Sequence, residues 1–192
     1  MSSACVTKTE PMCGCVRVLP LPQAAAALIH ISSAGNGPTV CAIGNAILAL
    51  GRRRDALATL IETPDLLAST VEETLRFDSA THMVARFARD DTELGGRKIR
   101  RGEMVYVVIG AANRDPARFA DADTLDIGRG DNRHLSFGMA IHFCLGAPLA
   151  RMMIATAISA AIARFGHLRL LHTQRGGTLL LRGPGRLVVG AE

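Results

Sequence analysis

The chain has 192 residues, 48% of them hydrophobic and 4% aromatic, with a formal net charge of +5. This length favours one domain and is enough to bury a hydrophobic core. With no tryptophan and one tyrosine, and with scattered basic residues, the composition argues against a nucleic-acid-binding surface. The one tight basic cluster, Arg52 to Arg54, is followed by Asp55; we interpret it as a solvated helix start, with a binding patch as the alternative.

The chain contains five cysteines, and its first ten residues lack the charged start and apolar run of a signal peptide. An odd cysteine count without a secretion signal favours a reducing, cytoplasmic location over a disulfide framework. A metal-binding module built from Cys5, Cys13 and Cys15 is an alternative, but their spacing fits zinc patterns poorly.

The N-terminal part of the chain divides at about residue 22. Residues 1–22 show no periodicity and are predicted to be irregular, whereas residues 23–192 form one domain. Residues 23–50 are predicted to form one long apolar helix with a kink or break at Pro38. The interval 18–51 has no charged residue, but the polar segment 32–38 interrupts it, so we expect a buried helix rather than a membrane span.

The middle and C-terminal parts mix helices with short strands. Helices are predicted over 53–62, over 64–77 with Pro64 in the first turn, and over 144–165. Strands are predicted over 82–88, 97–100 and 104–109, and two or three more over 168–190. Residues 110–136 show little regular pattern. The predicted class is mainly α with a small β-sheet (α+β).

The surroundings of Cys144 distinguish it from an ordinary buried cysteine. A lone cysteine is most often a small buried hydrophobe. Here Phe137-Gly138 and His142 precede it, Gly146 follows, and a predicted helix starts next to it. The positive end of a helix favours thiolate over thiol, and flanking glycines allow a flat ligand close to the backbone.

This run resembles the haem-ligand signature of the cytochrome P450 family, Phe-Gly-x-Gly-x-His-x-Cys-x-Gly. The matching positions are Phe137, Gly138, His142, Cys144 and Gly146, and Leu149-Ala150-Arg151 is a typical continuation. The resemblance implies the C-terminal part of the cytochrome P450 fold, with haem b (iron protoporphyrin IX) as cofactor and Cys144 as its iron ligand. Ala140 stands where the family has glycine; in a left-handed conformation an alanine costs about 1 kcal/mol.

Glu73 and Arg76 are three residues apart, so they share one helix face and can pair. An ordinary surface pair is the alternative. The spacing resembles the family's Glu-x-x-Arg helix, which implies a buried pair completed by a second arginine. Of the two candidates, Arg118 and Arg129, we choose Arg129 because it lies at the better distance before the cysteine loop. The resemblance also implies that Arg86 and His142 contact the haem propionates.

Residues 34–40 resemble the family's oxygen-binding helix. There an acid followed by an alcohol relays protons, but Gly37 and Pro38 occupy these positions, and neither carries a proton. Thr39 lies one place along, about 100° round a regular helix. It is a weak catalytic candidate, and no other catalytic residue is predicted.

The resemblance covers residues 28–190 and corresponds to the C-terminal half of the family's fold. It implies a haem-thiolate monooxygenase that takes electrons from a ferredoxin-type partner, docked on a basic face, and acts on a small apolar substrate. The alternative is a catalytically inactive remnant that at most binds haem. Because of Gly37 and Pro38 and the missing half, we expect this chain alone not to turn over substrate efficiently.

Overall fold

The computed structural model describes residues 20–191. The chain divides into two compact units, residues 1–34 and 35–192. One long helix, α1 (Leu21–Arg52), runs through the division. Nearly all of the predicted irregular segment, residues 1–22, lies outside the described residues.

Helix α1 is not broken at Pro38, so the predicted break is wrong. Proline lacks the N–H that would bond the Ala34 carbonyl four residues earlier. The division between the two units falls directly after Ala34. The missing hydrogen bond therefore coincides with the boundary, although the helical backbone continues across it. From Thr39 to Leu50 the helix is mostly buried, as expected for a core helix.

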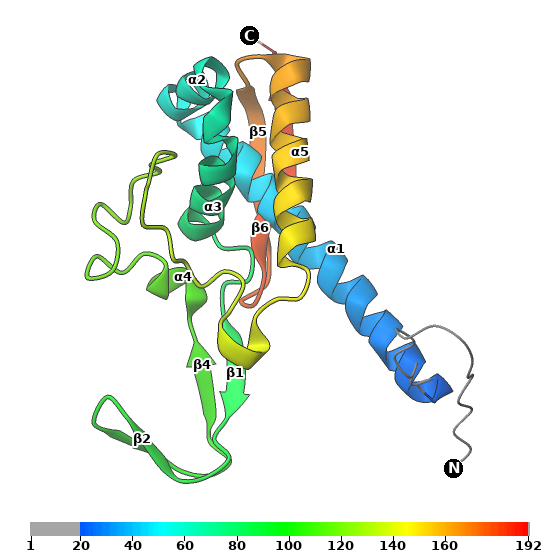
Figure 1. The fold of residues 1–192 in the computed structure, drawn as a ribbon, viewed down its shortest axis with the longest axis vertical. Coiled ribbons are helices and arrows are strands. Elements are labelled where there is room, and N and C mark those ends of the chain that lie inside the picture. Colours follow the sequence, from blue (N-terminus) through cyan, green and yellow to red (C-terminus); the bar gives the residue numbers. More distant parts are fainter. Residues whose placement is uncertain (1–19, 192) are drawn as a thin grey trace, which may run out of the picture. The chain divides into compact units, whose positions relative to one another are not determined.

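Three further helices complete the core of the second unit (Figure 1). Helix α2 (Arg54–Glu62) leads through the short 3₁₀ turn η1 (Pro64–Leu66) into α3 (Leu67–Phe77), which packs against α5 (Ala147–Phe165). Pro64 occupies the first position of the turn, as predicted. The core takes aliphatic side chains from all four helices, including Leu50, Leu57, Val71, Leu75, Ile154 and Ile158.

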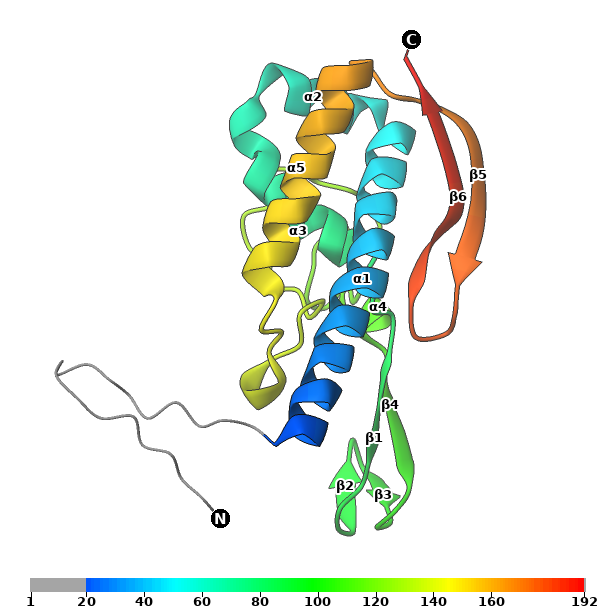
Figure 2. The same ribbon diagram turned by 90° about the vertical axis from the view of Figure 1, so that its right-hand side faces the viewer.

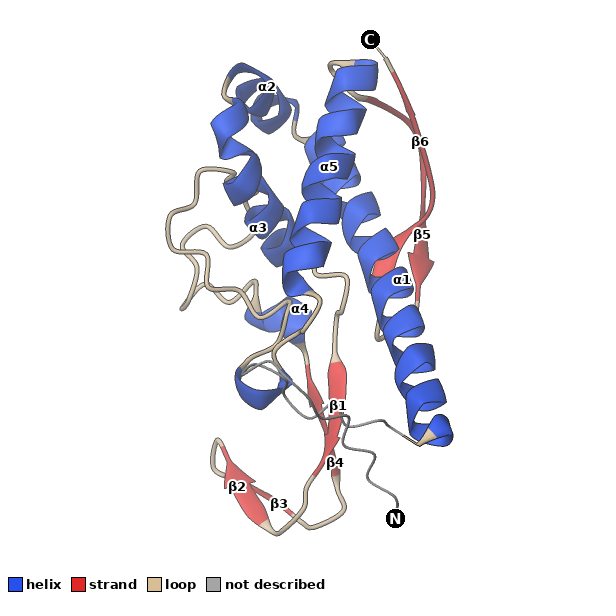
Figure 3. Ribbon diagram, turned by 45° about the vertical axis from the view of Figure 1, so that its right-hand side comes forward, coloured by secondary structure: helices blue, strands red, loops and turns tan. Residues whose placement is uncertain are grey.

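Three two-stranded antiparallel sheets supply the β part of the class (Figure 3). Strand β1 (Val84–Phe87) pairs with β4 (Met104–Val107), and β2 (Thr92–Leu94) pairs with β3 (Arg97–Ile99) around a Gly95-Gly96 turn. Strand β5 (Arg169–Gly177) pairs with β6 (Arg182–Gly190). The α+β class is confirmed; β2 was not predicted, and the strands form separate hairpins.

The β5–β6 hairpin lies along the second part of α1 (Figure 2). Two glycines of α1 permit this close approach. A Cβ added to Gly44 would lie 2.7 Å from the Pro184 side chain, and one added to Gly51 would lie 2.8 Å from Leu170. Real Cβ atoms essentially never make contacts this short, so a larger residue at Gly44 requires Pro184 to shift, and one at Gly51 requires the Leu170 side chain to shift.

Helix α5 starts at Ala147, three residues later than predicted, because Gly146 caps it and Pro148 occupies its first turn. It is the one helix among residues 20–191 whose length and composition would let it cross a membrane. Core helices of soluble proteins meet the same criterion, but those are mostly buried, whereas 11% of this stretch is buried in the described structure. Two short elements were also not predicted: α4 (Ile109–Ala112) and the 3₁₀ turn η2 (Ala140–His142).

Candidate functional site

Glu73 and Arg76 form a bidentate ion pair in the interior. They lie three residues apart on α3, and Arg76 Nε and Nη2 donate to the two Glu73 carboxylate oxygens at 2.8 Å each. Both side chains are fully buried. The predicted pairing is confirmed, and the surface alternative is excluded because neither side chain reaches solvent.

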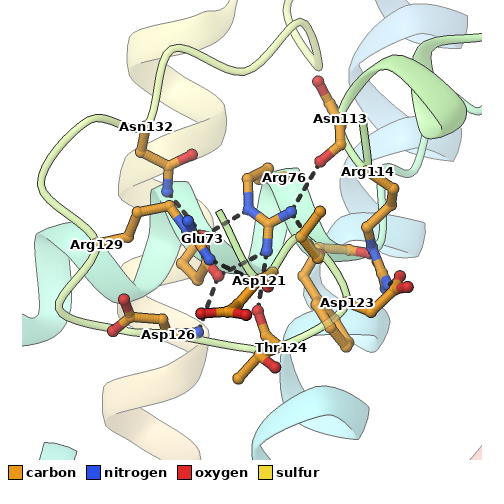
Figure 4. Close-up of polar contacts among 12 residues, drawn as sticks. Glu73, Arg76, Asn113, Arg114, Asp121, Asp123, Thr124, Asp126, Arg129 and Asn132 are labelled. Atoms are coloured by element: carbon orange, nitrogen blue, oxygen red, sulfur yellow. Dashed lines mark hydrogen bonds and ion pairs between the residues drawn. The ribbon is translucent and has the colours of Figure 1, made fainter. Parts of the chain in front are cut away.

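Three further donors complete the Glu73 carboxylate (Figure 4). Arg129 Nε donates at 3.2 Å, Asn132 Nδ2 at 3.0 Å and the backbone N–H of Asp126 at 2.9 Å. Arg129 is thus the second arginine, as chosen from its position in the sequence. The rejected candidate, Arg118, instead pairs with the exposed Asp131.

Arg76 also fixes the irregular segment that follows α4. Its guanidinium donates to the backbone carbonyls of Asn113, Ala122 and Thr124, at 2.8, 2.8 and 3.0 Å. Its carbon lies 5.2 Å from the centre of the Phe119 ring. The segment 113–132 therefore has few regular elements but a defined course, because it wraps round two buried charges.

Asn113 connects α3 to the start of the cysteine loop, and sequence reasoning gave it no role. Its amide nitrogen donates to the hydroxyls of Ser79 and Ser136, and its amide oxygen accepts the Leu135 N–H at 2.8 Å. Ser136 in turn donates to the Leu75 carbonyl of α3. The one sequence signal that could have indicated this role is the position of Asn113 directly after the apolar segment 104–112.

A second carboxylate of α3, Glu72, holds the loop from the other side. Arg151 of α5 donates to it through Nε at 2.6 Å and Nη2 at 2.9 Å, and His134 Nε2 lies 3.2 Å from it. Burial opposes ionisation of Glu72, but the hydrogen bonds from His134 and Arg151 outweigh it and lower its pKa to about 2. Glu72 therefore remains ionised across the physiological range.

Both partners of Glu72 also contact Phe137. The Arg151 guanidinium carbon lies 4.6 Å from the ring centre, and the His134 ring centre lies 6.0 Å away. The Phe137 carbonyl accepts the Cys144 backbone N–H at 2.9 Å. The network therefore runs from α3 through an aromatic side chain to the backbone of the cysteine.

The loop between Phe137 and Gly146 has two left-handed residues, Gly138 at φ +70° and Ala140 at φ +53°. A Cβ on Gly138 would lie 3.2 Å from the His142 carbonyl oxygen, a tight contact with backbone. The sequence predicts a cost for Ala140 if this position is left-handed, and it is. The alanine therefore carries strain of about 1 kcal/mol in a conformation that favours glycine.

The Cys144 thiol is free and exposed, two residues before the helix cap. Apolar side chains around it are exposed as well; Ile141 is 94% and Leu145 is 96% accessible, and Met139 and Phe143 are also exposed. So much apolar surface beside one polarisable thiol is unusual for a protein surface and marks a binding face.

The other predicted haem-contacting residues, Arg86 and His142, do not contact each other. Arg86 is exposed on β1 and donates to the Ala85 carbonyl, and His142 is exposed in η2. No hydrogen bond joins the two side chains within residues 20–191. Strand β1 and the cysteine loop do lie toward the same end of the second unit (Figures 1 and 2). Thr39 is buried on α1.

No cluster of three or more metal-binding side chains occurs in the described part of the chain. The alternative metal module, Cys5, Cys13 and Cys15, lies outside it.

The family model described as "Cytochrome P450" matches residues 48–176. The biotin biosynthesis cytochrome P450 of Bacillus subtilis is 45% identical over 148 residues, which are 77% of this chain and 38% of that protein. The polyketide biosynthesis cytochrome P450 PksS of the same organism is 44% identical over 138 residues, 71% of this chain and 34% of that one.

The solved structures agree with these relatives. P450BioI, crystallised with an acyl carrier protein bearing a hexadecenoic acid, superposes with a TM-score of 0.87 at 40% identity, covering 91% of this chain and 46% of that one. The PksS structure gives 0.87 at 38% identity over the same shares. The chain spans less than half the length of these relatives, and members of the family bind haem b.

Proposed function

The chain belongs to the cytochrome P450 family, and we propose that it is the haem-thiolate half of a monooxygenase, with Cys144 as the iron ligand. The single observation that carries this is the exposed Cys144 thiol, set in apolar surface and anchored from behind through Phe137. A ligand to a haem must be both accessible and held in place, and this cysteine is both.

The residues present fit a haem on this face. A thiolate is a strong donor to iron, and the exposed Met139, Ile141, Phe143 and Leu145 offer apolar contact to a flat macrocycle. Gly146 lies two residues after Cys144, and a Cβ there would lie 3.9 Å from Sγ of Cys144, so the protein itself would accept a side chain. We infer that the ligand is what requires glycine at position 146.

Arg86 and His142 are proposed to hold the two propionates. Both are exposed and free of any acidic partner in the described structure. A guanidinium forms charge-assisted hydrogen bonds with a carboxylate. Phe137 and Gly138 are proposed to shape the loop against the ring.

When bound, a thiolate-ligated haem supplies the activation of dioxygen. Delivering protons to that reaction is the task of α1, where Gly37 and Pro38 stand and Thr39 is buried. Neither Gly37 nor Pro38 carries a proton. We therefore propose that this chain alone turns over substrate poorly, and the same residues support the second candidate, an inactive remnant that at most binds haem.

If the chain is active, we propose a ferredoxin-type partner, a small apolar substrate and a cytoplasmic location. Arg133, which is 81% exposed close before the cysteine loop, pairs with Asp131 and would have to exchange this partner to contact an acidic protein.

The proposal is tested by adding haem to the purified chain and recording the carbon monoxide difference spectrum after reduction. A thiolate-type band is expected, and Cys144→Ser abolishes it. Cys41→Ser is the matched control, since Cys41 is half-buried on α1 away from the loop, and this variant keeps the band. Folded protein with no band, or a band that survives Cys144→Ser, overturns the assignment.

Turnover is tested separately by comparing electrons consumed with product formed. We expect electron consumption to exceed product because protons are poorly delivered. Product formation equal to electron consumption would contradict the argument from Gly37 and Pro38 but leave haem ligation intact.

A further inference from the structure

A pocket of about 410 Å³ in the second unit gathers arginines from four separate segments. Arg52 ends α1, Arg114 follows α4, Arg175 lies on β5 and Arg182 starts β6. The one acidic residue in its lining is Asp78, and Asp123 pairs with Arg114 from outside the lining. Four guanidiniums against two carboxylates leave the pocket with a net positive charge, and the proposed haem site uses none of these arginines.

Three of these arginines have no partner in the described structure. The side chains of Arg52, Arg175 and Arg182 donate no hydrogen bond and form no ion pair within residues 20–191. Arg182 is nevertheless half-buried. Because withdrawing a guanidinium from water is costly unless it is paired, a half-buried arginine without an anion indicates that its partner lies beyond residues 20–191.

Arg114 is fixed in place by the fold. Its Nε and Nη2 donate to the Phe77 carbonyl at 2.8 and 2.6 Å, and its Nη1 donates to Asp123 at 2.6 Å. The guanidinium stacks on the Phe77 ring, 3.8 Å from its centre. Of its five N–H groups these bonds use three, so two remain available in a fixed orientation.

The walls of the pocket are also tied together. Asn45 of α1 donates to the carbonyls of Asp78 and Arg182, at 2.9 and 3.0 Å, and the Arg182 N–H donates to the Ala80 carbonyl at 2.8 Å. The start of β6 is therefore held against the chain that leaves α3. The backbone of the pocket and Arg114 are therefore held in place, and an anion that binds orders mainly the side chains of the other three arginines.

The pKa of His82, which also lines the pocket, is affected by the nearby positive charge. Its burial and the nearby Arg182 lower its pKa, with Asp78 acting weakly in the opposite direction. His82 thus adds a neutral imidazole to the wall at physiological pH.

We propose that this pocket is a binding site for a small diphosphate-bearing anion. Planar guanidiniums match phosphoryl oxygens in bidentate geometry, and several converging arginines call for an anion of more than one charge. A diphosphate meets both conditions and is small relative to the pocket. The proposal stands whether or not Cys144 binds haem, because the two sites share no ligand.

Isothermal titration of the 192-residue chain with inorganic pyrophosphate tests it. Saturable one-to-one binding is expected, weakened at least tenfold by Arg182→Met and by Arg175→Met. Arg186→Met is the matched control: it removes the same charge from the same hairpin outside the pocket, and binding stays within twofold. If Arg182→Met does not fold, the exposed Arg175 still gives the answer.

Two further titrants define the ligand class. ADP that binds more tightly than pyrophosphate assigns the site to a nucleotide diphosphate, and ADP that binds no better assigns it to free diphosphate. Citrate carries a similar charge on carboxylates. Citrate binding as tight as pyrophosphate, an equal loss in Arg186→Met, or no saturable binding overturns the proposal.

Discussion

The centre formed by Glu73 and Arg76 and the loop around Cys144 are built in opposite ways. The centre is fully buried, and each carboxylate oxygen and guanidinium nitrogen has a partner within 3.2 Å. The loop is exposed, apolar and strained at Ala140. A buried centre whose polar atoms are all hydrogen-bonded specifies the fold. An exposed thiol among exposed apolar side chains is instead suited to binding a ligand from outside the chain.

Glu72 and Glu73 join the two regions. They are neighbours on α3, but Glu73 serves the buried centre and Glu72 holds Arg151, which stacks on Phe137. Adjacent residues of a helix point about 100° apart, so one turn of α3 supports both regions. The loop is thus positioned by the same helix that organises the core.

The largest effect is expected at the buried centre. Glu73→Gln leaves the Arg76 charge buried without its counter-ion, and this lowers the free energy of unfolding by about 3–5 kcal/mol. Urea denaturation followed by circular dichroism measures the loss, or the variant fails to fold.

Two matched variants sharpen this comparison. Glu62→Gln changes an exposed acid at the end of α2, and Cys144→Ser changes the exposed thiol; each should alter stability by less than about 0.5 kcal/mol. A loss in Cys144→Ser as large as that in Glu73→Gln would mean that the loop, too, is part of the folding core.

A smaller loss of unfolding free energy, which depends on pH, is expected when Glu72 is replaced by glutamine. The Glu72 pKa is about 2 in the fold against 4.5 for the unperturbed group. A depressed pKa stabilises the fold above the unfolded value, and this contribution is lost as pH falls from about 4.5 to 2. The difference between these two pKa values corresponds to at most about 3.4 kcal/mol, and partial exposure of the Glu72 side chain reduces this to about 2–3 kcal/mol.

The measurement compares the native chain with Glu72→Gln in urea at several pH values. The gap in unfolding free energy should be full at pH 7 and should narrow below pH 4.5. A gap that is constant down to pH 2.5 would show that Glu72 contributes by packing rather than by charge.

The smallest expected effect concerns the strained loop. Ala140→Gly relieves the left-handed alanine and should raise the free energy of unfolding by about 1 kcal/mol. Ala160→Gly, on the exposed face of α5, is the control with opposite sign, since glycine in a helix interior costs about 1 kcal/mol. If Ala140→Gly also destabilises, the loop does not store the strain that its dihedral angle indicates.

Sequence reasoning succeeded where the signal was local or tied to a family pattern. The spacing of Glu73 and Arg76 is a helix-face argument and needs no tertiary information. The preference for Arg129 over Arg118 came from the distance to the cysteine loop, and the Glu73 contact confirms it. The break at Pro38 was wrong because a proline removes one hydrogen bond without ending a helix that is packed on its far side.

Residues that act across the fold were the ones missed. Asn132 belongs to a stretch without periodicity, so nothing in the sequence separates it from solvated polar residues, and Asn113 is marked only by its place after an apolar segment. The pairing of Glu72 with Arg151 joins positions 79 residues apart. The arginines of the diphosphate pocket come from four segments, and their scattered positions gave no sign of a shared site.

The sequence by itself determined the family pattern of the cysteine loop, the helix that carries Glu73 and Arg76, and the α+β class. Those features depend on periodicity, spacing and the chemistry of neighbouring residues. Only the tertiary structure decided which polar groups share the Glu73 carboxylate, that Ala140 is left-handed, and that four arginines face one pocket. Contacts between distant segments depend on how the whole chain packs, and no local pattern records that packing.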